Sequence, residues 1–274
     1  METRPLARGD VRLMLDFLSE EWPHGRGPGY AFMAQRLPYD DWDARLWFEG
    51  GRLAGWGWRV RGHFSYACRD ASLLDEIVPW AGVDETTVRS GDDAAAEMLA
   101  RHGFEFDADA PWIRENARTL DEIEAPVAPG GYRLTTMAEY GDFASRASAH
   151  RSAFRPSRFT DRVYRTVREE TPWLAELDCV LVDPEGEVVA YALGWLDARN
   201  RLGELEPVGV RRPHHRRGFG RAVCLFALQQ LKAAGAETAI VGSRGDDGYP
   251  APRLLYESIG FRERVRDLPF TRAS

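Results

Sequence analysis

The chain has 274 residues, more than one ordinary domain and enough for two domains that each bury a core. Its 44% hydrophobic content indicates a folded protein, and no apolar run reaches the roughly 20 residues of a membrane span, so we expect no membrane partner. The net charge of -7 argues against nucleic acid as the main partner. Three distant cysteines fit a reducing compartment, and we therefore expect a cytoplasmic protein.

In the first half, apolar periodicity and turn residues predict helices and a hairpin. The expected elements are helices over 7–22 and 30–37, strands over 45–49 and 52–60, and a helix from Ala94 that Gly103 ends. The segment 120–131 then carries two prolines and two glycines, a composition typical of a connection. This segment predicts two domains, 1–125 and 126–274.

The second half repeats the coarse order of the first. The expected elements are a strand over 132–136, helices over 138–154 and 161–170, strands over 179–183, 188–196 and 204–210, a helix from Phe219 that ends near Gly235, a strand over 238–242, and a helix from Pro250 stopped by Gly260. In both halves a hairpin follows the early helices, and a late helix ends in Gly-Phe. We interpret this repetition as an internal duplication.

The segment 211–221 reads Arg-Arg-Pro-His-His-Arg-Arg-Gly-Phe-Gly-Arg and joins a predicted strand to a predicted helix. Gly218 and Gly220 let the backbone approach a ligand, and the positive end of the helix favours anions. The arginines add charge-assisted hydrogen bonds to phosphate oxygens. Acidic residues are in clear surplus over 1–125, whereas 126–274 is slightly basic. The segment therefore predicts a diphosphate site in the second domain.

This order of elements resembles the GNAT superfamily of N-acetyltransferases, which move an acyl group from a coenzyme A thioester to an amine. The family's pyrophosphate loop, Gln/Arg-x-x-Gly-x-Gly/Ala, aligns with 215–220, where His215 takes the first position. A second family motif, Leu-Tyr-x-x-x-Gly-Phe, aligns without a gap with 255–261. The resemblance implies acetyl-CoA as the acyl donor and a small-molecule amine as the acceptor. It places the segment 150–155 near that acceptor.

The whole chain resembles tandem arrangements such as that of mycothiol synthase. The implied fold is α/β, with two tandem GNAT-like domains, each a mixed, mostly antiparallel sheet flanked by helices. The first copy lacks Gly-x-Gly, and 68–76 carries acids at the expected helix start instead. Leu99 and Ala100 stand where the second copy has Tyr256. We interpret the first domain as a degenerate copy, and either a monomer or a homodimer fits two fused copies.

The resemblance also implies the catalytic residues. Some members carry a catalytic Glu six residues before the last Val of the central strand, here Glu204, which acts as a general base. Glu206 competes for this role, because strand alternation predicts that Glu204, Glu206, Val208 and Val210 share one face. Tyr256 takes the role of general acid toward the coenzyme A sulfur. The implied cofactor contacts are Val208, Gly209, Val210, His215, Arg216, Arg217, Gly218, Phe219, Gly220 and Arg221.

Within that set, the backbone of Val210 is implied to polarise the thioester carbonyl, and Gly209 to mark where strands separate for the pantetheine arm. Other functions remain open at this stage. A noncatalytic acyl-CoA-binding or regulatory module would also use the phosphate loop. A dinucleotide-dependent oxidoreductase fits poorly, because the third position of Gly-x-Gly-x-x-Gly is Val223. We expect no metal site, since His214 and His215 have no Cys or Glu at ligand spacing.

Overall fold

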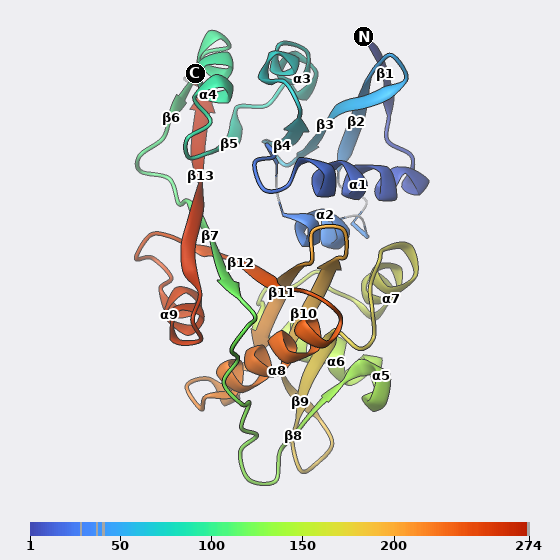
Figure 1. Ribbon diagram of the computed structural model, residues 1–274, viewed down its shortest axis with the longest axis vertical. Helices are drawn as coiled ribbons and strands as arrows, with labels where there is room; N and C mark the ends of the chain where they lie inside the picture. The colour runs from blue at the N-terminus through green and yellow to red at the C-terminus, as the bar shows by residue number, and fades with distance from the viewer. Residues whose placement is uncertain (28, 37, 40–41, 273–274) are drawn as a thin grey trace. The chain divides into compact units, whose positions relative to one another are not determined.

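A computed structural model describes residues 1–27, 29–36, 38–39 and 42–272. The chain forms two compact units. The first comprises Met1–Glu115, Ser243–Pro250 and Glu263–Ser274, and the second comprises Asn116–Gly242 and Ala251–Arg262. Both units follow the same element order of a strand, helices, three antiparallel strands, a helix, a strand and a helix (Figure 1).

The first unit builds its sheet in the order β1-β2-β3-β4-β5-β13, and β6 also pairs with β13. The strands are β1 (Glu2–Pro5), β2 (Asp43–Glu49), β3 (Arg52–Val60), β4 (His63–Cys68), β5 (Glu85–Arg89), β6 (Phe104–Phe106) and β13 (Arg262–Arg272). The helices are α1 (Val11–Glu21), α2 (Tyr30–Arg36), α3 (Leu74–Ala81) and α4 (Asp93–Arg101), and short 3-10 turns precede α1 and α3. One apolar cluster lies under α1 and α2, and another under α3 and α4.

The second unit has the sheet order β12-β11-β10-β9-β8. Its strands are β8 (Arg133–Thr136), β9 (Asp178–Val182), β10 (Val188–Asp197), β11 (Leu202–Val210) and β12 (Thr238–Arg244), while β7 (Ile113–Thr119) leads into the unit. Its helices are α5 (Met137–Tyr140), α6 (Phe143–Ala153), α7 (Asp161–Glu170), α8 (Phe219–Ala233) and α9 (Ala251–Ser258). Pairing is antiparallel except between β11 and β12. The predicted fold class, a mixed and mostly antiparallel sheet flanked by helices, is confirmed.

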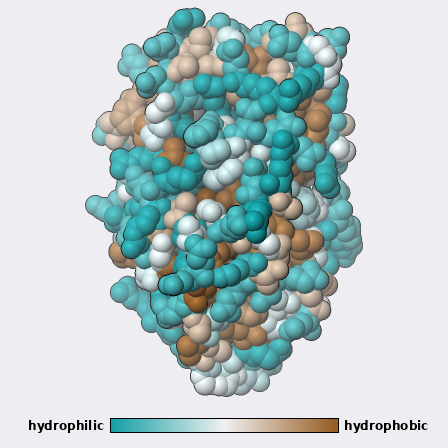
Figure 2. Space-filling model, in the orientation of Figure 1, coloured by the Kyte–Doolittle hydropathy of each residue, from teal (hydrophilic) through white to brown (hydrophobic). Residues whose placement is uncertain are grey.

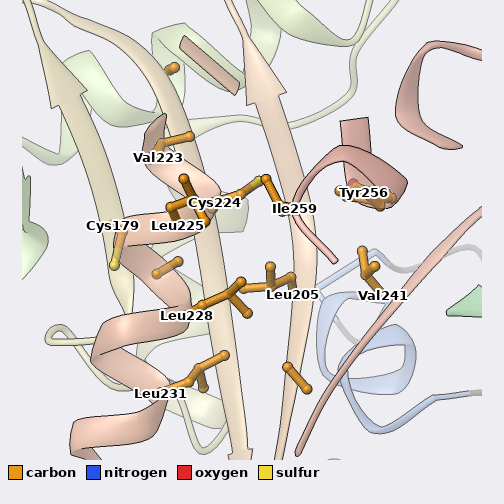
Figure 3. Close-up of a cluster of buried hydrophobic side chains, with 14 of the residues drawn as sticks. Cys179, Leu205, Val223, Cys224, Leu225, Leu228, Leu231, Val241, Tyr256 and Ile259 are labelled. Carbon is orange, nitrogen blue, oxygen red and sulfur yellow. The ribbon is translucent and has the colours of Figure 1, made fainter. Parts of the chain in front are cut away.

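Two helices of this unit cover opposite faces of its sheet. Successive side chains of a strand point to opposite faces, and along β10 Ala190 and Ala192 join the cluster under α8, while Tyr191 joins the cluster under α6. Figure 3 shows the α8 side, where Leu228 lies beside Leu205 of β11 and Leu231 lies further along α8 in the same cluster. Different helices therefore pack against the two faces of β11.

One helix predicted from sequence differs in the structure, and a second is found as predicted over the described residues. The predicted helix over 138–154 is two helices, because Gly141 has a left-handed backbone (φ 74°) and ends α5. Asp142 then caps α6 by accepting hydrogen bonds from the amides of Ala144 and Ser145, both at 3.0 Å. The predicted helix over 30–37 is found as α2, and Leu37 lies outside the described residues.

The surface drawn in Figure 2 is mostly hydrophilic, with hydrophobic residues scattered among polar ones. In the part of the chain that the structure describes, no helix has the length and apolar character that crossing a bilayer requires.

Candidate active site

Strands β11 and β12 run side by side only at their first residues. The parallel pairs are Leu202 with Thr238, Gly203 with Ala239, and Glu204 with Ile240. Beyond this point β11 continues to Val210 and β12 to Arg244, but no further residue of these fully described strands pairs with the other strand. The β12-facing backbone edge of 205–210 is thereby open to a ligand that pairs with a strand.

A β-bulge interrupts β11 inside this open stretch. Gly194 of β10 pairs with Leu205, whereas Ala192 pairs with Val208, so β11 has one extra residue there. The indole Nε1 of Trp195 donates a 2.6 Å hydrogen bond to the Glu206 carbonyl within the bulge. The predicted alternation is therefore wrong, because the extra residue inverts the faces beyond it.

The bulge separates the candidate residues of β11. Glu204 pairs with Trp195 and Gly209 pairs with Tyr191, which places both on the α6 face. Val208 and Val210 pack against the α8 cluster on the opposite face. Glu204 is only 7% exposed and lies at the last paired position, whereas Glu206 is half-buried in the bulge. Glu204 does not share a face with Val208 and Val210.

Tyr191 lies directly over Gly209. A Cβ atom added to Gly209 would lie 2.6 Å from the Tyr191 hydroxyl, so this position requires glycine for the contact to exist. The hydroxyl hydrogen-bonds His150 Nδ1 at 2.8 Å, and the His150 ring stacks on Phe159 at 4.0 Å between centroids. Burial, followed by the charges of Arg146 and Arg151, lowers the pKa of His150 to about 3. His150 is therefore neutral on the α6 face.

A buried ion pair lies next to Tyr191 on the α6 face. Arg146 Nε donates to Asp178 Oδ1 at 2.8 Å, and both side chains are at most 1% exposed. The other carboxylate oxygen accepts a 2.5 Å bond from the Tyr164 hydroxyl and a 3.3 Å bond from Trp173 Nε1. The Arg146 guanidinium lies 3.5 Å from the Tyr191 ring centroid. Tyr191 is thus held between a cation and the His150 ring.

The predicted phosphate cradle lies at the amino end of α8. The first α-helical bond runs from Ala222 N–H to the Gly218 carbonyl, so the amides of Phe219, Gly220 and Arg221 precede the helical pattern. Gly218 has a left-handed backbone (φ 78°) and gives the helix no side-chain cap. These amides are oriented as anion donors.

Gly220 lies in a closely packed position. A Cβ there would meet Leu255 at 3.2 Å and Val210 at 3.5 Å, so the small residue lets α8 approach α9 and β11.

The basic side chains around the cradle divide into fixed and unengaged groups. His215 Nε2 hydrogen-bonds the Val210 carbonyl at 3.0 Å, which fastens the loop to the end of β11. Arg217 stacks near Phe219, and Arg221 donates to the Ser258 carbonyl at 2.7 Å. Arg216 is exposed, and its side chain has no polar partner within the described ranges. Arg216 is therefore the side chain most available to phosphate oxygens.

Tyr256 lies on α9 and is 6% exposed. Its ring packs edge-on against Phe261, with centroids 6.0 Å apart, and Figure 3 shows it beside Ile259 and Val241. The carbonyl of Tyr256 accepts the amides of Ile259 and Phe261 at 3.2 and 3.1 Å, which closes the helix at Gly260. The Leu-Tyr-x-x-x-Gly-Phe motif thus fixes the Tyr256 ring in the core under α8.

Sequence reasoning assigned no role to Tyr191, Arg146 or Asp178. A usable signal was present, since Arg146 and His150 stand four residues apart on one helix face, and Asp178 begins an otherwise apolar strand. Among the described residues, no three His, Cys, Asp or Glu side chains gather as a metal site.

Residues 144–261 match the family model described as the acetyltransferase (GNAT) family. The chain carries a GNAT acetyltransferase domain. The matched segment includes α6 from its second residue, β11, the cradle and the Tyr256 motif. A mycothiol acetyltransferase of Streptomyces griseus subsp. griseus is 27% identical over 218 residues, which cover 77% of this chain and 67% of that protein. The domain match and these relatives support an N-acetyltransferase, and the GNAT family generally uses acetyl-CoA.

Solved structures agree on the fold of this chain. A GCN5-related N-acetyltransferase from Sphaerobacter thermophilus gives a TM-score of 0.64 at 21% identity, covering 98% of this chain and 94% of that one. A tandem GNAT protein from the clavulanic acid biosynthesis pathway gives 0.63 at 18% identity, covering 98% and 97%. At these identities the likeness concerns the fold alone. Among the first curated relatives, the matched regions span from 49% to 67% of the relative's length.

Proposed function

We propose that this protein transfers an acetyl group from acetyl-CoA to a primary amine of a small molecule, by direct attack within a ternary complex. The separation of β11 from β12 beyond the pair Glu204–Ile240 carries this proposal. It opens a backbone edge that leads from a buried carboxylate to the amides at the start of α8. Acetyl-CoA is a long molecule that carries an activated acyl group at one end and a diphosphate toward the other. The acyl group would lie beside the buried carboxylate, and the diphosphate would lie at the start of α8.

The cradle holds the donor in this proposal. The amides of Phe219, Gly220 and Arg221 and the Arg216 guanidinium bind the diphosphate, aided by the helix dipole. The β11 edge, with Val208, Gly209 and Val210, holds the pantetheine arm, and the amide of Val210 polarises the acyl carbonyl.

The base is a carboxylate of β11. Glu204 remains our first assignment, because it is buried where the two strands part and faces α6, opposite the helix that binds the diphosphate. Glu206 is the competitor, because the bulge leaves it half-buried within the open stretch. Either carboxylate takes a proton from the attacking amine. Tyr256 donates a proton to the departing thiolate.

The first unit is proposed to be a degenerate copy that binds no coenzyme A. Asp70 occupies the position equivalent to the phosphate loop, ahead of the 3-10 turn that precedes α3. Its carboxylate accepts the Ser72 amide at 2.9 Å. A side chain thus engages the amide that a phosphate would need, and its negative charge repels one. We therefore expect one donor site per chain.

A calorimetric titration with acetyl-CoA tests this proposal. Gly218→Asp places a carboxylate in the cradle, and we expect wild-type binding at one site per chain and no binding by the variant. Gly186→Asp is a matched control, since Gly186 is exposed in the β9–β10 turn and also has a positive φ (91°). Absence of acetyl-CoA binding by the wild type would refute the proposal, and two sites per chain would refute a degenerate first unit.

The base assignment is tested by turnover with an amine substrate. Glu204→Gln should lower kcat by roughly two orders of magnitude, the usual contribution of a general base, without lowering acetyl-CoA affinity. The Glu206→Gln protein is the matched comparison on the same strand. If only that variant loses turnover, the base is Glu206. Tyr256→Phe should slow the reaction, and most strongly with acceptors for which departure of the thiolate limits the rate. An unchanged rate would show that Tyr256 is not the acid.

A further inference from the structure

A cleft rich in arginine lies where α6 ends beside the loop that follows β11. It has a volume of about 520 Å³ and belongs wholly to the second unit. Its lining includes Ser148, Arg151, Ser152, Arg155, Arg211 and Arg212, and none of its lining residues is acidic. Four guanidinium groups from two separate segments thus converge on one hollow.

Two of these arginines are partly neutralised by neighbours outside the cleft. Arg151 pairs with Asp161 at 2.9 Å, and Arg211 pairs with Glu187 at 3.2 Å. Both carboxylates are largely exposed, at 66% and 58%, so water screens these pairs.

The other two arginines have no such neighbour. The guanidinium groups of Arg155 and Arg212 make no hydrogen bond or ion pair with any residue that the structure describes. Arg155 follows the end of α6, and Arg212 begins the turn after β11. The carbonyl end of α6 carries about half a negative charge, which four arginines far exceed. The cleft therefore has a local excess of positive charge.

The cleft does not include the amides at the start of α8, but it adjoins them, because His214 lines the cleft and stacks on Phe219 at 5.8 Å between ring centroids. Helix α6 covers the face of β11 opposite α8, and Arg211, which lines the cleft, directly follows the last residue of β11. An anion in the cleft would therefore lie at the end of β11, beside the diphosphate cradle but not in it.

We propose that this cleft is a second anion subsite, which binds a phosphate or carboxylate group of a ligand at the acetyl-transfer site. The planar forks of Arg155 and Arg212 bind such a group in a bidentate manner, and the Ser148 and Ser152 hydroxyls supply further donors. The inference rests on the proposed function in one respect, namely which ligand carries the anion. The source is either the 3′-phosphate of coenzyme A or an acidic group of the amine acceptor.

The first arm of the test compares coenzyme A with 3′-dephospho-coenzyme A by calorimetry. If the 3′-phosphate is the source, the wild type should bind coenzyme A about tenfold more tightly, because charged hydrogen bonds to two arginines are lost with the phosphate. The Arg155→Ala/Arg212→Ala protein should bind both ligands with equal affinity. The Arg155→Lys/Arg212→Lys protein keeps the charge but lacks the planar guanidinium. Its preference for coenzyme A over 3′-dephospho-coenzyme A should lie between the preferences of the wild type and the alanine variant.

The second arm measures the thermal unfolding midpoint against inorganic phosphate, with chloride holding the ionic strength constant. Phosphate should stabilise the free wild-type protein more than the Arg155→Ala/Arg212→Ala protein. If the acceptor is the source, this difference persists when coenzyme A saturates the protein. If the 3′-phosphate is the source, it disappears.

A charge-matched control is Arg133→Ala/Arg165→Ala, which removes two exposed arginines of the same unit outside the cleft. This control should behave as the wild type in both arms. The proposal is overturned if the cleft variant matches the wild type in both arms, or if the control loses as much as the cleft variant. Failure of the proposed function is distinguishable, since the wild type would then bind no coenzyme A while the phosphate titration still reports on the cleft.

Discussion

Lowering the pH from 7 to 5 should destabilise the second unit through His150. This side chain is 9% exposed, and its Nδ1 is held by the Tyr191 hydroxyl. Burial first, and then the charges of Arg146 and Arg151, lower its pKa to about 3, whereas an unfolded histidine titrates near 6.5. The folded-state pKa of this base is depressed, so stability falls as the pH drops below about 6.5 and keeps falling toward about 3.

The size of this effect follows from the difference between the two pKa values. Each pH unit below about 6.5 costs about 1.4 kcal/mol, so His150 removes roughly 2 kcal/mol between pH 7 and pH 5. Asp267 of the first unit acts in the opposite sense, because burial raises the pKa of its carboxyl to about 6. Asp267 therefore increases the free energy of unfolding as the pH falls from about 6 toward about 4. The His150 effect is therefore defined by comparison with a variant, not by the wild type alone.

His150→Asn is the suitable variant, because its amide oxygen can replace Nδ1 as the acceptor for Tyr191 but cannot be protonated. Urea unfolding at pH 7 and pH 5 should show that the free energy of unfolding falls by about 2 kcal/mol more in the wild type than in this variant. Proton NMR of the His150 ring should show no titration between pH 8 and pH 5. A ring that titrates near pH 6, or equal losses in the two proteins, would refute the reasoning.

Three further outcomes follow from the packing of the second unit. Gly209→Ala should cost about 1–3 kcal/mol in urea unfolding, and Tyr191→Phe should restore part of it, because the added Cβ meets the Tyr191 hydroxyl at 2.6 Å. Asp178→Asn should cost about 3–5 kcal/mol by leaving Arg146 buried without its counter-charge, whereas a loss below 1 kcal/mol would contradict the buried ion pair. The three buried thiols should resist a disulfide reagent until the protein unfolds, since burial raises the pKa of Cys224 to about 12, and rapid labelling of the native protein would contradict this burial.

Features that depend only on residues close together in the sequence were predictable. The hairpin strands over 45–49 and 52–60 and the helix from Phe219 follow from local periodicity and glycine placement, and the structure has all three. The break at Gly141 was missed, although it is also local. Glycine inside an apolar periodic run is compatible with a continuous helix, and only its left-handed backbone shows that the helix ends there.

The polar network on the α6 face could not be predicted in the same way. Arg146 and Asp178 are 32 residues apart, and Tyr191 and His150 are 41 residues apart. Each residue alone is a charged or aromatic side chain in a helix or strand, and only strand pairing brings them together. Arginine is rarely buried without a partner, and the fold buries Arg146 against Tyr191 because Asp178 supplies the counter-charge there.

One extra residue in β11 has the largest consequence for the chemistry. With strict alternation, Glu204 would face α8 together with Val208 and Val210, in the apolar cluster of that helix. The bulge lets β11 present Glu204 to the α6 face while Val208 and Val210 still fill the α8 core. A carboxylate is thereby separated from the apolar core but stays on the strand whose edge opens toward the cradle. In the proposed ternary complex, an acceptor that approaches from the α6 side would meet this carboxylate and the arginine-lined cleft on one face, while α8 would hold the diphosphate of the donor.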